Sequence, residues 1–578
     1  MRNIALTIIT SLLLISVSSC EDMMGDFLEK APGVDVTEDT IFSSKAEVEK
    51  FLASIYQYGI HSTFGYGTNN LIAGPQSTLS AGATDEAETC AAWYDTQKWN
   101  NGSLSPNDTY DGRWPYRWIA IRKITVMLDR VDEVPDISRE YAAQLKAESK
   151  TLRAMNYYEM LKRYGGVPII NQRIQLSDNL KIPRSSVEDV ANFILSDLND
   201  ETVNALPLNQ TGVLKGRIHQ GVALALRAKL YLLIARDLFN TDKPYMNFGS
   251  NNNLICMGKH DNELWNKAAV AAKDVLDWAK EAGCSLITDQ GVTKNYKYQW
   301  EQYDNNEIIL AEKASGTCGK WSWPWNAISP PNVYPGNSGQ SGITVTFNFV
   351  KKYEKIDGTE QTWDENGGND LQAKMAELDP RFAQTIAYNQ SYWNKEFPKM
   401  EIYEGGRQYP TCSGGFWLHK HYPEIISEEV WTYVPNSTIL SLNEFYLNYA
   451  EALNEYNNGP TQEAYDAINE IRTRSGMPNI PSGLDYLAFR EKVRHERAIE
   501  LAFDDHRLYD VRHWKIAQNE GVMNGNMWGL KITQIDGSNE FHYEPYVFET
   551  RTFSTKMYLE PFPQGEVNKG YLIQNPGY

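Results

Sequence analysis

Long windows of helical periodicity constrain the fold of this chain more than any other feature. Apolar side chains recur every three or four residues in the windows 140–163, 186–205, 217–238, 264–280, 441–457, 462–475 and 485–503. This spacing places the apolar side chains on one face of an α-helix. Ser185 and Glu188 predict a capping box for the second window. Helices of this length in adjacent pairs predict stacked helical hairpins of the tetratricopeptide kind, although no strict consensus of about 34 residues is present.

Irregular stretches rich in aromatic residues separate these helical windows. Residues 284–440 and 59–116 are rich in Gly, Pro, Asn, Trp and Tyr, and a third such stretch covers 520–560. Long loops are usually functional or disordered, and this aromatic content is not typical of disorder. Residues 343–350 (ITVTFNFV) alternate like a β-strand. The expected fold is therefore mostly α, with a helical scaffold, large loop-rich insertions and few short strands.

Composition excludes several classes of protein. The 578 residues carry a net charge of -19, contain 42% hydrophobic residues and have a mean hydropathy of -0.50. No run of 18 or more apolar residues occurs in the body of the chain, so a multispan membrane protein is not expected. A chain this acidic repels phosphate backbones, so we expect no nucleic-acid partner.

The N-terminus has the order of a secretory signal. Arg2 is followed by an apolar run from Ile4 to Val17, then by Ser18, Ser19 and Cys20. A plain signal peptide with an incidental cysteine is one reading. A cysteine directly after small residues fits a bacterial lipoprotein better, with residues 1–19 removed and lipid attached to Cys20. Two or more acyl chains give stable anchoring, so we expect an otherwise soluble body tethered to a membrane.

No enzyme signature is present in the sequence. The chain lacks GxSxG, HExxH, GxxxxGK[ST] and GxGxxG. Catalytic carboxylates flank a bond from opposite sides, whereas Asp85-Glu86 and Asp504-Asp505 are sequence neighbours. A glycosidase whose acids lie far apart in the sequence stays open. We expect no catalytic residues and no cofactor.

Two further segments contain residue types that can bind metal ions. Residues 494–514 (RHERAIELAFDDHRLYDVRHW) contain three histidines, but so many arginines beside carboxylates are more typical of ion pairs that join helices. Residues 357–370 offer carboxylate and amide oxygens around Gly367-Gly368, a loose likeness to a calcium loop without its spacing or terminal Glu. We expect no metal at either, with a structural calcium at 357–370 as the open alternative. After Cys20, five cysteines are left, and this odd count argues against a disulfide framework.

Three tryptophans crowd the segment 316–326 (GTCGKWSWPWN). Trp321, Trp323 and Trp325 alternate, so in an extended chain they project on one side. A glycine- and proline-containing loop can hold such rings outward, where the C–H faces of sugars stack on indoles. The other reading is an aromatic plug buried within a loop. Exposed aromatic clusters usually mark interaction sites, and the lipoprotein signal favours capture at a cell surface.

Several stretches, taken in order, resemble the SusD/RagB family of Gram-negative outer-membrane nutrient-binding lipoproteins. They are CEDMMGDFLEKAPG, TEDTIFSSKAEVEKFLASIYQ, AESKTLRAMNYYEMLKRYGGVPII, SVEDVANFILSDLNDETVNALP, GRIHQGVALALRAKLYLLIA, EFYLNYAEALNEY, INEIRTRSGMP, HERAIELAFDDHRLYDVRHW and YLEPFPQGEVNKGYLIQNPGY. No single motif is decisive, but their order is specific and covers essentially the whole chain. The family usually has Arg where this chain has Ser441-Leu442-Asn443, and Glu-Gly where it has Asp504-Asp505.

The resemblance implies a single SusD-like domain over residues 20–578. Its helical scaffold covers mainly 40–60, 117–283 and 440–517, and its loop-rich ligand-binding region covers mainly 61–116 and 284–439. Four tetratricopeptide-like helix pairs are implied, with a short helix at 343–350. The implied partner is a SusC-like TonB-dependent transporter barrel in the outer membrane, which the helical half contacts and on which the lipid-anchored, surface-exposed protein sits as a lid.

The resemblance also implies where the ligand binds. Family sites vary but tend to use aromatics from the loop after Thr84-Asp85-Glu86 and from the middle insertion. The candidate ligand-binding residues here are Trp321, Trp323, Trp99, Trp325, Trp93, Tyr94, Tyr296, Tyr298 and Trp300. The expected function is non-catalytic capture of a glycan, with a RagB-like peptide-binding lipoprotein serving a peptide importer as the alternative.

Overall fold

The structure is a computed structural model. It describes residues 37–60, 79–175, 177–312, 329–333, 342–409, 414–425, 437–536 and 538–578.

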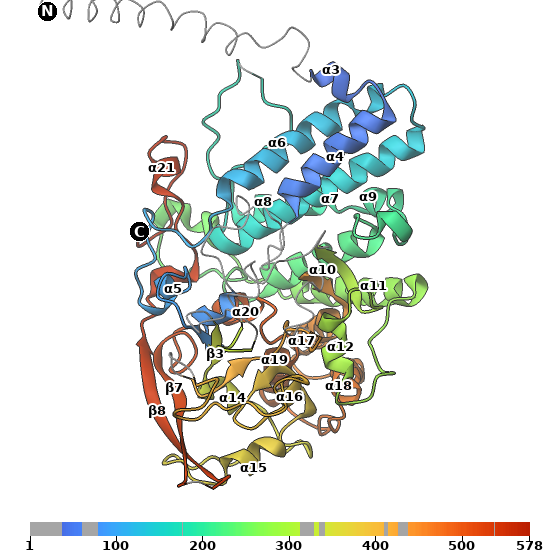
Figure 1. Ribbon diagram of the computed structural model, residues 1–578. Helices are drawn as coiled ribbons and strands as arrows, with labels where there is room; N and C mark the ends of the chain where they lie inside the picture. The colour runs from blue at the N-terminus through green and yellow to red at the C-terminus, as the bar shows by residue number, and fades with distance from the viewer. Residues whose placement is uncertain are drawn as a thin grey trace, which may run out of the picture.

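Helices dominate the described residues and fill the upper and central parts of the molecule (Figure 1). The first group comprises α3 (Glu38–Ile41), α4 (Lys45–Gly59), α5 (Gln97–Asn100), α6 (Trp114–Arg130), α7 (Arg139–Tyr164), α8 (Val187–Asp197), α9 (Asp200–Ala205), α10 (Gln220–Ala235), α11 (Glu263–Ala282) and α12 (Asn295–Glu301). The second comprises α14 (Phe347–Val350), α15 (Leu371–Ala376), α16 (Pro380–Thr385), α17 (Leu442–Asn457), α18 (Gln462–Arg474), α19 (Tyr486–Glu500), α20 (Arg507–His513) and α21 (Gln564–Val567). Short 3₁₀ turns are η1 (Ser80–Ala83), η2 (Val131–Glu133), η3 (Gly212–Leu214), η4 (Gly249–Leu254) and η5 (Thr555–Tyr558).

The helices begin and end where local chemistry dictates. The hydroxyl of Ser138 caps α7 by accepting the N–H of Tyr141, and α7 stops at Gly165, whose φ is 76°. A Cβ on Gly165 would lie 2.5 Å from the carbonyl oxygen of Leu254. Only glycine therefore fits this crossing between α7 and the chain near η4.

The window 186–205 is not one helix. Its capping box joins Ser186 to Asp189, one residue later than the predicted pair of Ser185 and Glu188. The window then breaks, because the side chain of Asn199 accepts the N–H of Thr202 and starts the new helix α9. A cap inside an apolar window can thus interrupt a helix that periodicity alone continues.

Neighbouring helices pack as hairpins, which confirms the tetratricopeptide-like scaffold. α10 packs along α11, α11 along α17, and α17 along α18 and α19, so helices from both ends of the sequence share one array. Their apolar faces form one core that also takes side chains from α4, α6, α7 and α8. In Figure 1, α4, α6 and α7 lie side by side above this array.

Four antiparallel strand pairs occur among the described residues. They are β1 (Ala87–Thr89) with β3 (Ile343–Val345), β2 (Ile308–Glu312) with β6 (Ser437–Ser441), β4 (Ile386–Ala387) with β5 (Trp417–Leu418), and β7 (Gly525–Gln534) with β8 (Phe541–Arg551). The segment 343–350 is both strand and helix, because Thr346 follows β3 and caps α14 by accepting the N–H of Phe349.

The insertions have a second apolar core of their own. Its largest members are aromatic: Phe347, Phe349, Trp393, Phe416 and Trp417 are all buried. Much of the region expected to be loop-rich is therefore packed around these rings. No helix in the described part of the chain is long and apolar enough to cross a membrane.

Candidate functional site

The segment from Ser80 to Asn100 is the rigid base of the candidate site. Asp85 is fully buried and accepts two hydrogen bonds from the guanidinium of Arg507, each 2.8 Å long. Burial alone would raise the pKa of Asp85, but Arg507 and Lys352 outweigh this effect and hold the pKa below its ordinary value. This pair attaches the early loop to α20 in the helical scaffold.

Two further carboxyls hold the same segment. Glu86 accepts the N–H of Phe503 at 2.8 Å, and its burial raises its pKa to about 8. Arg551 on β8 donates to Glu88 at 2.6 Å and to the carbonyl oxygens of Thr84 and Ala87. Contacts from α20 and β8 therefore immobilise the segment on two sides.

Trp93 projects from this base into solvent. Its side chain is 55% exposed, in the loop between β1 and α5, and the largely buried ring of Tyr94 lies 6.1 Å away. The loop is fixed at its start, because β1 pairs with β3 and the N–H of Cys90 donates to Gly342. The early loop and the middle insertion, far apart in sequence, thus lie side by side.

A second exposed ring, Tyr409, belongs to a segment connected to the same strands. Tyr409 is 37% exposed. The preceding residue, Gln408, accepts the indole N–H of Trp417 at 2.8 Å, and the Trp417 ring closes on Gly342. We call the exposed ring of Trp93 the aromatic platform. Sequence reasoning missed Tyr409, because a single tyrosine in a long loop carries no pattern.

Three candidate ligand-binding rings lie in the interior instead. Trp99 is 1% exposed, beneath the guanidinium of Arg512 at 4.8 Å. Tyr296 is fully buried, and its hydroxyl donates to the carbonyl of Glu500 and accepts from Lys420. Trp300 is also buried. α5 and α12 turn these rings inward, so their faces are not available for stacking, which corrects the expectation for these positions.

The other candidates differ in their exposure. Trp93 is exposed and Tyr298 half-buried, whereas Tyr94 is largely buried. Trp321, Trp323 and Trp325 lie outside the described residues.

The charged segment 494–514 forms ion pairs, as its composition predicts. Arg497 contacts Asp510, and Arg236 contacts both Asp510 and Glu451. On the same helix α19, Glu496 and Glu500 pair with Arg381 from α16. Among the described residues, no group of three or more His, Cys, Asp or Glu side chains is arranged to hold a metal ion.

The segment 357–370 folds as a turn against β8. Asp364 accepts the N–H of Asn366, and Asp370 pairs with Lys374 at 3.0 Å. A Cβ on Gly367 would lie 1.9 Å from the carbonyl oxygen of Tyr543. This close approach explains the glycine, and Asp364 and Asp370 both have partners within the protein.

Cys90 is disulfide-bonded, while Cys256 and Cys284 are free. The odd count of cysteines argued against a disulfide framework. It did not exclude a single bridge, and Cys90 lies three residues before Trp93 in the sequence.

The two departures from the family pattern have local structural explanations. Asn443 donates to Glu500 at 2.7 Å, beside the arginines that Glu500 also receives. Asp505 adopts a φ of 60°, a conformation that glycine takes without strain. Its carboxylate accepts the N–H and hydroxyl of Ser80, and burial raises its pKa to about 6.

Comparison of the sequence with known protein families identifies the family of this chain. Residues 293–578 match the SusD family, and residues 26–232 match a family described as starch-binding and associating with the outer membrane. The chain belongs to the SusD/RagB family.

Individual relatives match along most of their length. SusD-like protein P25 of Formosa agariphila is 23% identical over 525 residues, 87% of this chain and 88% of the relative. A crystal structure of a SusD-like protein from Bacteroides fragilis is 25% identical, with a TM-score of 0.75, over 95% of this chain and all of that one. A structure titled laminarin binding SusD-like protein is 19% identical, with a TM-score of 0.63, over 93% of this chain and all of that one.

Proposed function

We propose that this protein is a lipid-anchored surface protein that captures an oligosaccharide or polysaccharide and delivers it to a SusC-like TonB-dependent barrel, without cleaving it. Family membership supports carbohydrate binding at the coarse level. The signal order before Cys20 supports an outer-membrane lipid anchor. Loss of membrane attachment in Cys20→Ser, and copurification of a barrel with the wild type, test the anchor and the partner.

The observation that carries glycan capture is Trp93, an indole held outward on an immobile base. Its segment is held by Arg507 and Arg551, so little conformational entropy is lost when a ligand stacks on the ring. Tyr409 is a further exposed ring among the described residues, and Trp321 and Trp323 are further candidates.

Affinity electrophoresis in gels containing laminarin, soluble starch, xylan, mannan or galactan tests the proposal. One stacked ring contributes about 1–2 kcal/mol, by analogy with base stacking. Trp93→Ala should therefore weaken retention by the bound polymer about 5- to 30-fold, and Tyr409→Ala and the double variant Trp321→Ala/Trp323→Ala should also weaken it. Leu487→Ala, which trims an exposed side chain on α19, is the control and should leave retention unchanged.

The results discriminate among the functions. Unchanged retention in all three aromatic variants would reject the site and leave the family assignment standing. Binding to peptide pools but to no polysaccharide would select the RagB-like alternative. Release of reducing sugar by the purified protein would establish an enzyme.

A further inference from the structure

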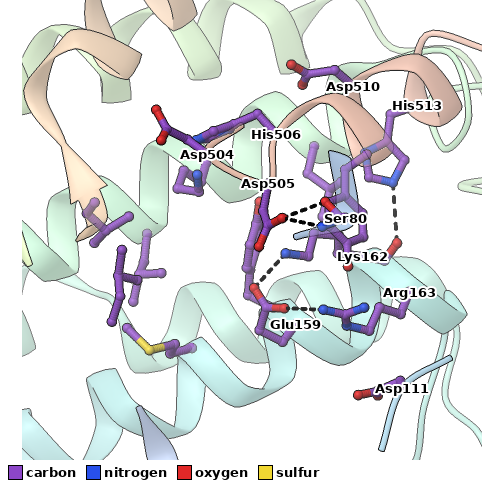
Figure 2. A pocket seen from close by; sticks show the side chains of 18 of the residues that line it. Ser80, Asp111, Glu159, Lys162, Arg163, Asp504, Asp505, His506, Asp510 and His513 are labelled. Carbon is purple, nitrogen blue, oxygen red and sulfur yellow. Dashed lines mark hydrogen bonds and ion pairs between the residues drawn. The ribbon is translucent and has the colours of Figure 1, made fainter. Parts of the chain in front are cut away.

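The helical scaffold contains a cavity whose lining includes neither Trp93 nor Tyr409. It has a volume of about 250 Å³ and lies among α6, α7, α10, β6, α17 and the segment that leads into α20. In Figure 2, Glu159, Lys162 and Arg163 line it from α7, and Asp505, His506 and His513 line it from the opposite side.

The cavity has an apolar wall and a polar wall. Met155, Leu226, Leu233 and Leu440 contribute the apolar side chains. Opposite them are tyrosine hydroxyls, carboxylates and basic groups. This combination of apolar side chains and convergent polar groups is typical of a site for a small organic molecule.

The charges of the polar wall are compensated within the protein. Glu159 pairs with Lys162 at 2.7 Å and with Arg163 at 3.3 Å (Figure 2). Glu444 pairs with Lys229, and Asp510 pairs with Arg236. An ion entering the cavity would meet groups that already have partners, so a neutral ligand fits better than a charged one.

Three neutral hydroxyls, by contrast, lack protein partners. Among the residues that the structure describes, the hydroxyls of Tyr110, Tyr158 and Tyr509 form no hydrogen bond, although all three residues line the cavity. A hydroxyl in this position can both donate to and accept from a molecule inside the cavity.

We propose that this cavity binds an uncharged polyhydroxylated molecule of about monosaccharide size. Its hydroxyls would pair with the hydroxyls of Tyr110, Tyr158 and Tyr509, since hydroxyl groups both donate and accept. Its C–H face would lie against Met155, Leu226 and Leu440. This second site is independent of polymer capture at the platform.

Saturation-transfer NMR with the mature chain and D-glucose, D-galactose, D-mannose, D-xylose, L-fucose and myo-inositol tests the proposal. At least one probe should bind saturably. Tyr158→Phe and Tyr509→Phe keep the packing and remove one hydroxyl each, so each should weaken that probe about 3- to 10-fold. The matched control Tyr449→Phe removes a hydroxyl bonded to Glu463, away from the cavity, and should leave binding unchanged.

Further measurements separate this site from the platform. Trp93→Ala should keep the saturable probe binding, and Tyr158→Phe should keep retention by the polymer. Saturable binding of none of the six probes, which indicates a cavity filled by water only, would overturn the proposal. So would binding that is lost in Trp93→Ala, binding that is unchanged in both cavity variants, or saturable binding of ethanolamine or acetate in place of the sugars.

Discussion

The surroundings of the buried Glu86 side chain determine its pKa. Its carboxyl lies in the interior and accepts the N–H of Phe503, with no cation in hydrogen-bonding contact. Burial, together with the nearby carboxyl of Asp85, raises its pKa to about 8, from an ordinary value of 4.5. Between pH 4.5 and about 8, the folded state therefore holds a proton on Glu86, whereas the unfolded chain releases it.

We expect the variant Glu86→Gln to remove part of the pH dependence of stability. Because the folded pKa is raised, the contribution of Glu86 is fully present below pH 4.5 and is lost as the pH rises through about 8. The wild type should therefore lose up to about 1.4 kcal/mol of unfolding free energy per pH unit in this interval relative to the variant. Urea denaturation at pH 5.5, 6.5, 7.5 and 8.5 measures the difference.

The control is Glu201→Gln, a change at an exposed position, and its unfolding free energy should vary with pH as that of the wild type does. If the unfolding free energy of Glu86→Gln also follows the pH dependence of the wild type, Glu86 is ionised in the folded protein.

At this residue scale the sequence predicted which residue types cluster, as at 494–514, but it did not reveal which carboxyls are paired. Asp85 and Glu86 are neighbours, yet only Asp85 meets an arginine.

At the scale of elements, the contact between α10 and α11 depends on one glycine. A Cβ on Gly221 would lie 2.3 Å from the ring of Trp278. That ring cannot move easily, because its indole N–H donates to the carbonyl of Leu208 at 2.9 Å and His219 stacks on it. The window 217–238 predicted α10, but this close helix crossing has no sequence signal beyond the glycine itself.

We expect Gly221→Ala to lower the unfolding free energy by about 1–2 kcal/mol. Overpacking costs about 1–3 kcal/mol, and the higher helix propensity of alanine offsets up to about 1 kcal/mol of it. The matched control is Gly565→Ala in α21, where no atom lies within 4 Å of the new Cβ. Thermal unfolding should show a lower midpoint for the first variant only, and equal midpoints would mean that α10 and α11 separate without cost.

Across the whole molecule, Arg381 connects the two cores. It lies on α16 beside the aromatic core and donates to Asp379, Glu496 and Glu500, the last two on α19 of the scaffold. All four side chains are buried. This cluster, together with Asp85 and Arg507, makes the insertions part of one body with the helices. We therefore propose that residues 20–578 unfold as a single domain.

We expect Arg381→Met to reduce the unfolding free energy by about 3–5 kcal/mol, because it leaves buried carboxylates without their shared cation. Lys273→Met removes an exposed pair with Asp277 and should cost less than about 1 kcal/mol. Denaturant unfolding followed by tryptophan fluorescence and by circular dichroism measures both. Two separate transitions in the wild type would contradict a single cooperative domain.

The sequence by itself determined the helical scaffold, the arginine–carboxylate clusters and the family. Periodicity and capping act over a few residues, and the order of motifs is read directly along the chain. Only the tertiary structure decided which rings are exposed. Trp93 and Trp99 lie in one short segment, yet one is in solvent and the other beneath Arg512. Burial depends on partners hundreds of residues away, which no local pattern encodes.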